Sequence, residues 1–223
     1  MFEFLPAALS FALLALFLGF KHSYDADHIV AVANLLRKSR SMKESFRMSI
    51  SWSLGHMLTA SGITAILYVF RESILQAILS RFELIVGIML IGLGLYTIGD
   101  VFLFHRHEHS SGKAAHEHSH MHSKPADKKH LHKHMFGIGI VHGLASNDEL
   151  LILLTASLGV TSLVGMLAGV AIFSIGVVGG MMLFAAIFSY PMLKIYSDRI
   201  YAAVSILVAV SSIVYGGMML AGI

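Results

Sequence analysis

Cysteine is absent from this chain of 223 residues, and charged residues make up only 13%, against about 25% in a typical soluble domain. Without thiols, disulfides, thiolate metal sites and iron–sulfur clusters are excluded. The first residues, MFEFLP, hold no Lys or Arg, so they lack the basic start of a cleavable signal and we expect a retained membrane segment. In contrast, 56% of the residues are hydrophobic and the mean hydropathy is +0.75, which indicates an all-α integral membrane protein.

Six apolar segments are long enough to cross a bilayer, which needs about 20 residues per helix. They cover residues 4–36, 48–70, 82–104, 135–160, 163–189 and 198–221. The basic segment 37–47 after the first span should be cytoplasmic, because Lys and Arg favour that side. Six spans then place both termini outside. In this orientation thirteen of the 16 Lys and Arg residues lie inside, with Arg71 and Arg81 outside and Lys21 within a span.

The two halves of the chain align with each other. His22 aligned with His142 sets GFKHSYDADHIVAVANLL against GIVHGLASNDELLILLTASL, and 53–56 then falls opposite 174–177 with the offset changed by one residue. Three spans per half would force the halves into opposite orientations, as in transporters built from inverted repeats. The alternative is chance similarity between helices of low complexity. The predicted units are a three-helix repeat over 1–104, a loop over 105–134 and a second repeat over 135–223.

An ionisable cluster interrupts the first span, where HSYDADH places His22, Asp25, Asp27 and His28 between apolar segments. An Asp at membrane depth costs roughly 2.5–3.5 kcal/mol, so we expect these groups to face a cavity, pair with one another or hold an ion. Imidazole and carboxylate without thiol suit a divalent metal ion. In a regular helix His22 and His28 lie on opposed faces. Either the helix unwinds between them, or one is a ligand and a carboxylate supports it.

Further candidate ligands lie on later spans. His56 lies beside Gly55 and Ser53, small residues that let helices approach closely, and we expect it to bind the ion or line its path. A hydrogen bond between helices is the alternative. In the second half of the chain, His142, Asp148 and Glu149 lie at the equivalent depth. They would form a gate, accept protons or complete the metal site. The alternative is that Asp148 and Glu149 are solvated acids at the start of a helix. The predicted metal residues are His22, Asp25, Asp27, His28, His56, His142, Asp148 and Glu149, and no catalytic or cofactor-binding residue is predicted.

Ten of the 14 histidines lie in residues 105–134, with almost no aliphatic residue. This composition predicts a disordered cytosolic loop that binds metal weakly at several places. Imidazole favours Ni, Co, Zn and Cu over Mg and Ca. The loop would suit a sink or sensor for imported metal, or equally a collector of metal for export. An expression tag is another explanation for these histidines. Their irregular mixture with Glu, Lys and Ser argues against it.

Two motifs resemble those of the nickel/cobalt permease family, in particular its short, urease-accessory-type members. The phrase KHSYDADHI, which contains His22, Asp27 and His28, resembles the family's signature in an early transmembrane helix. Leu54-Gly55-His56 is similar to the Leu-Gly-His motif of the following helix. LASNDE, at 144–149, only loosely resembles a later acidic motif, because it ends in the same Glu but lacks the Phe-Asp start.

The resemblance is close over residues 15–60 and weaker over 137–160, and this chain supports six spans where longer members have eight. It implies transport of Ni²⁺ or Co²⁺ without ATP hydrolysis, which agrees with the absence of a Gly-rich phosphate loop. We therefore expect a permease, not an enzyme, that carries the ion inward across a prokaryotic plasma membrane. Its partners would be the bilayer, the ion and a cytosolic metallochaperone, but no nucleic acid. The alternatives are a metal exporter, an intramembrane metalloenzyme such as a di-iron oxidase, and a metal sensor.

Overall fold

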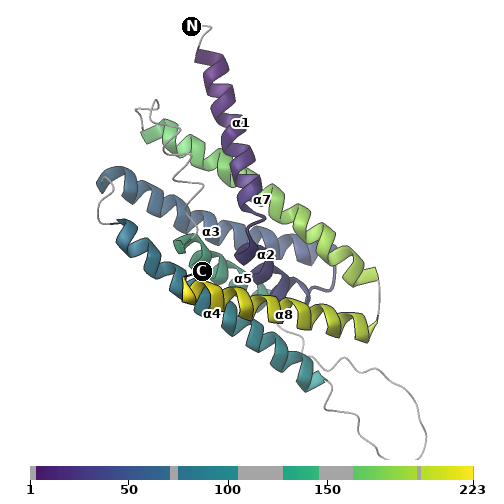
Figure 1. Ribbon diagram of the computed structural model, residues 1–223. Helices are drawn as coiled ribbons and strands as arrows, with labels where there is room; N and C mark the ends of the chain where they lie inside the picture. Colours follow the sequence, from purple (N-terminus) through teal and green to yellow (C-terminus); the bar gives the residue numbers. More distant parts are fainter. Residues whose placement is uncertain (1–3, 71–74, 105–127, 146–162, 195–196, 223) are drawn as a thin grey trace, which may run out of the picture.

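The computed structural model describes residues 4–70, 75–104, 128–145, 163–194 and 197–222, and it is all-helical over these residues (Figure 1). The described helices are α1 (Phe4–His22), α2 (Ala26–Leu36), α3 (Met42–Phe70), α4 (Leu75–Phe104), α5 (Lys128–Ala145), α7 (Leu163–Lys194) and α8 (Asp198–Ala221). The expectation of an all-helical chain is confirmed for these residues.

Three helices are long and apolar enough to cross a bilayer by themselves. The spanning segments are Phe82–Phe102 of α4, Leu167–Lys194 of α7 and Arg199–Ala221 of α8. They coincide with the spans predicted at 82–104, 163–189 and 198–221. Two shorter apolar helices, Ala8–His22 and Ala26–Leu36, together cover the first predicted span. The chain is therefore a multi-pass membrane protein.

The first predicted span is broken at its polar motif. α1 ends at His22, and Asp25 has an extended backbone (φ −61°, ψ 144°) as the cap before α2. Between the helices, the Tyr24 N–H donates to the Lys21 carbonyl at 3.0 Å and the Asp25 N–H to the His22 carbonyl at 3.1 Å. The unwound alternative is therefore the correct one here. α5 ends at Ala145, and the second predicted interruption falls in 146–162, outside the described residues.

One predicted boundary differs from the structure. The predicted His-rich loop ends at residue 134, whereas α5 begins at Lys128, so residues 128–134 are helical. Lys and Leu are good helix formers, and no Gly or Pro occurs between Lys128 and Phe136, so the helix continues beyond the apolar segment. Residues 105–127, the rest of the predicted loop, lie outside the described residues.

Glycines bring pairs of helices into backbone contact. In the α3–α5 crossing, a methyl group at Gly55 would meet the backbone of Phe136, and one at Gly139 would meet the backbone of Trp52. Such close approach is typical of small residues in membrane helices. The crossing fixes the middle of α3 against α5.

The α1–α7 crossing has the same form. A methyl group at Gly19 would meet the backbone of Phe173, and one at Gly176 would meet the backbone of Leu16. A third close crossing joins α4 to α8, where Gly87 and Gly216 face each other's backbone. In Figure 1, α2 lies in the midst of the surrounding helices, and residues 31–37 are all buried.

Candidate metal centre

Three histidines from three helices meet at the break between α1 and α2. His22 ends α1, His28 lies in the first turn of α2, and His56 lies midway along α3. All three are at most 1% exposed, and one ring nitrogen from each lies within 4.8 Å of the others. Three buried imidazoles at this spacing form a group that could hold one metal ion.

The helix break turns His28 back toward His22. The Nδ1–H of His28 donates to the His22 carbonyl at 3.0 Å, and the two rings meet edge to face with their centroids 4.6 Å apart. Because a carbonyl can only accept, the hydrogen of a neutral His28 lies on Nδ1. Its Nε2 then has the lone pair that a metal ion needs.

Asp25 orients the second imidazole. Its Oδ2 lies 2.9 Å from His22 Nδ1, and the Nε2 of His22 lies 3.2 Å from the Nε2 of His56. A neutral His22 that donates to Asp25 accepts at Nε2, so the shared hydrogen lies on His56. The Asp25 side chain is 29% exposed, and Lys21 approaches its other oxygen at 3.8 Å. Asp25 therefore supports His22 from outside the three-histidine group, in the manner of carboxylates behind metal-binding histidines.

A fourth buried histidine lies beside this group. The Nδ1–H of His142, on α5, donates to the Ile138 carbonyl at 3.1 Å, and its ring centroid is 5.4 Å from that of His28. Among the described residues, no hydrogen-bond partner is found for His142 Nε2. The two halves of the chain thus each contribute imidazole to the same buried region.

Asp27 supplies a negative charge next to His28. It is 7% exposed, and its Oδ2 lies 3.7 Å from His28 Nε2, which is close but longer than a hydrogen bond. A buried carboxylate beside an imidazole lone pair favours a cation over a neutral ligand. Of the residues predicted for the site, Asp148 and Glu149 lie outside the described residues.

The sequence matches a family described as the cytochrome C biogenesis protein transmembrane region over residues 10–218. The chain belongs to this family. It is also 30% identical over 185 residues to the urease accessory protein UreH of Bacillus sp. (strain TB-90), a match that covers 82% of this chain and 78% of that protein. No solved structure matches the chain.

The 223 residues of this family member include no cysteine and therefore offer no thiol for thiol–disulfide exchange. Its buried ionisable groups are instead imidazole and carboxylate. The similarity to UreH confirms the expected relation to urease-accessory-type membrane proteins. The description of the family as a transmembrane region agrees with the membrane-spanning helices of the structure.

Trp52 is a residue of this centre that the sequence reading missed. Its indole stacks on the His56 ring with centroids 5.1 Å apart and planes at 14°, and it lies 4.9 Å from the His28 ring. Trp52 is fully buried and is the chain's only tryptophan. The sequence did contain a signal for this residue, because Trp52 and His56 are four residues apart and therefore share a face of a helix. Its fluorescence would report on an ion bound among the histidines.

The variant Asp25→Asn tests whether the Asp25 carboxylate supports His22 as a metal ligand. Asn is as good a helix cap as Asp, so α2 should keep its start, but the charged acceptor for His22 Nδ1 is lost. We expect Ni²⁺ affinity, measured by quenching of Trp52 fluorescence, to fall about 10–100-fold. Glu83→Gln, on an exposed position of α4, is the matched control. An affinity within about twofold of the wild type would show that Asp25 does not act on the metal centre.

Proposed function

We propose that this chain is a secondary transporter that carries Ni²⁺ or Co²⁺ across the plasma membrane into the cytoplasm through its buried histidine centre. The observation that carries the proposal is the convergence of His22, His28 and His56, with ring nitrogens within 4.8 Å, inside a multi-pass membrane protein. Buried polar groups at membrane depth are typical of ion pathways. Asp27 and His142 are proposed as further members of the site, and Asp148 and Glu149 stay candidates from the sequence.

Nickel or cobalt is favoured by the donor set and by the relatives. Neutral imidazole suits the later divalent transition metals, whereas Mg²⁺ and Ca²⁺ prefer oxygen. The motif resemblance to nickel/cobalt permeases of the urease-accessory type agrees with the similarity to the urease accessory protein UreH. Residues 105–127, rich in histidine, would buffer the ion in the cytosol.

An inverted repeat of two three-helix halves, with six spans and both termini outside, is the architecture that we propose. The aligned sequences pair Gly19 with Gly139 and Trp52 with Phe173. Gly139 lies against Trp52 and Gly19 against Phe173, so the α3–α5 and α1–α7 crossings are counterparts. Gly55 against Phe136 and Gly176 against Leu16 form a second such pair. These matching contacts are what an inverted repeat produces, and they favour a boundary between the halves before α5.

Inward movement is favoured by the membrane potential. A potential that is negative inside drives each charge inward with about 2.3 kcal/mol per 100 mV, so a dication gains about twice that amount. Export would need a separate energy source. A cytosolic histidine-rich segment that collects surplus ion is compatible with export, so the direction has to be measured.

Uptake of radioactive nickel into liposomes that contain the purified protein tests this function. We expect entry that depends on an inside-negative potential, is lost in Asp27→Asn and is only slowed by deletion of residues 106–127. Glu83→Gln serves as the control for a charge removed elsewhere. Binding without any entry would indicate a sensor and would contradict transport. Movement that only an opposite driving force supports would reverse the proposed direction.

A further inference from the structure

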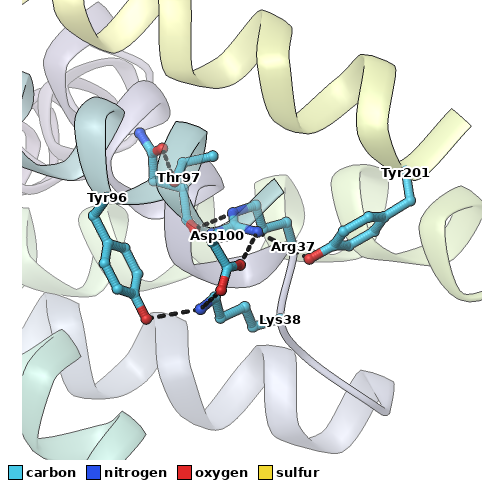
Figure 2. Close-up of polar contacts among 7 residues, drawn as sticks. Arg37, Lys38, Tyr96, Thr97, Asp100 and Tyr201 are labelled. Carbon is cyan, nitrogen blue, oxygen red and sulfur yellow. Dashed lines mark hydrogen bonds and ion pairs between the residues drawn. The ribbon is translucent and has the colours of Figure 1, made fainter. Parts of the chain in front are cut away.

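A second polar cluster ties the end of α2 to α4 and α8 (Figure 2). Arg37, which caps α2, donates from Nη1 to Asp100 Oδ2 at 2.8 Å and to the Tyr201 hydroxyl at 2.9 Å. Lys38 donates from Nζ to Asp100 Oδ1 at 3.0 Å and to the Tyr96 hydroxyl at 2.7 Å. Both cations therefore converge on one carboxylate.

The connection extends one turn back along α2. The Thr97 hydroxyl donates to Asn34 Oδ1 at 2.7 Å in a buried contact. The same end of α2 is thus joined to α4 at two levels, by Asn34 and by Arg37. We call the contacts of Arg37, Lys38 and Asp100 with each other and with Tyr96 and Tyr201 the α2 latch.

α2 is a separate piece of helix that links the latch to the metal centre. It is only 11 residues long, and its first turn carries Asp27 and His28. The break at 23–25 separates it from α1, and after Arg37 the chain turns before α3 begins at Met42. A displacement of the latched end would therefore move His28 relative to His22 and His56, which lie on other helices.

The latch is built from contacts that water can replace. The side chains of Asp100 and Lys38 are 19% and 21% exposed, so water can reach both, whereas at the α4–α8 crossing the backbones of Gly87 and Gly216 approach each other directly. Arg37 is buried, and no hydrogen-bond partner is found for its Nη2 among the described residues. On release, this nitrogen would gain water as a partner, which offsets part of the cost of breaking the ion pairs.

We propose that the α2 latch is the cytoplasmic gate of the transport path: it holds α2 against α4 and α8, and it must open for the ion to leave toward the cytoplasm. This inference rests on the proposed function, because the ion is the reason for opening. The positive residues in 37–47 predict that this end of α2 lies at the cytoplasmic side. The latch depends most on Asp100, because loss of its carboxylate removes the acceptor that Arg37 and Lys38 share.

A single introduced cysteine tests the gate, because the natural chain has none. Ala31 is fully buried and packs with Val86 and Leu90 of α4, so Ala31→Cys reports separation of α2 from α4. Ala15→Cys is the matched control, since Ala15 is equally buried on α1 in the other apolar cluster. In inside-out vesicles, a membrane-impermeant maleimide should label Ala31→Cys about tenfold faster or more when Asp100→Asn is added, as expected when the closed state loses a charge-assisted hydrogen bond.

Labelling of Ala15→Cys should not change in the Asp100→Asn background. Unchanged labelling of Ala31→Cys, or a rise at both cysteines together, would overturn the gate. If Asp100→Asn does not fold, Lys38→Gln and Tyr201→Phe each remove part of the latch and should give a smaller rise at Ala31→Cys only. Asp100→Glu should restore slow labelling.

Two further measurements distinguish a failure of the gate from a failure of the proposed transport function. Ni²⁺ should still quench Trp52 in Asp100→Asn, because all three histidines remain, but with a lower affinity because the freed α2 can move His28, and the rate of nickel uptake should change. If the wild-type protein admits no nickel to liposomes, the transport function fails, whatever the labelling shows. If the wild type transports nickel and Asp100→Asn changes neither labelling nor uptake, only the gate fails.

Discussion

His28→Asn is expected to abolish nickel binding while leaving the fold in place. The amide group of Asn reaches about the position of Nδ1 in histidine, so it can still donate to the His22 carbonyl, which His28 now does at 3.0 Å. Nothing replaces Nε2, the nitrogen that points away from this hydrogen bond. Loss of a supporting group costs about 10–100-fold in metal affinity, and loss of a ligand should exceed the upper figure.

Quenching of Trp52 fluorescence is the measurement, since its indole lies 4.9 Å from the His28 ring. His134→Asn is the matched control, because His134 is an exposed histidine on α5. We expect this control to bind nickel as the wild type does. Nickel affinity retained in His28→Asn, at an unchanged melting temperature, would show that His28 caps the helix break and does not bind the ion.

The sequence predicted the kind of site but left its geometry open. Imidazole and carboxylate groups in an apolar span indicate a buried ion site by their cost alone. Rotation along a helix showed that His22 and His28 could meet only if the helix were broken, but periodicity cannot decide whether it is. Tertiary contacts near the break, such as the close approach of α1 to α7 at Gly19 and Gly176, are not visible in the periodicity of the sequence.

The sequence alone does not predict contacts between residues that are far apart in the chain. Arg37 and Asp100 are 63 residues apart, and Arg37 and Tyr201 are 164 apart, so no local pattern joins them. Positive charge after the first span predicts that residues 37–47 are cytoplasmic, but it gives no reason to expect a buried Arg37. The position of His142 beside His28 likewise joins two helices, α5 and α2, that are far apart in the sequence.

Two glycines on α5 should respond to the same substitution in opposite ways. Gly139→Ala places a methyl group against the backbone of Trp52 and the nitrogen of His56, where no flexible side chain can give way. α3 and α5 must then separate. Overpacking of this kind typically costs about 1–3 kcal/mol, so the melting temperature in detergent should fall. Gly137→Ala meets nothing within 4 Å, and the gain in helix propensity should stabilise the protein by about 0.5–1 kcal/mol.

The two glycine variants should also differ in nickel binding, because the α3–α5 crossing sets the distance between His56 on α3 and His142 on α5. A separation of these helices displaces His56 from its present position in the three-histidine centre, so Gly139→Ala should weaken quenching of Trp52, whereas Gly137→Ala should leave it unchanged. Equal melting temperatures for the two variants would mean that the backbone contact at Gly139 does not limit how closely the helices pack. A destabilised Gly139→Ala protein with normal nickel affinity would instead mean that the α3–α5 crossing does not set the position of His56 in the three-histidine centre, so that α3 would have to be held there by its contacts with other helices.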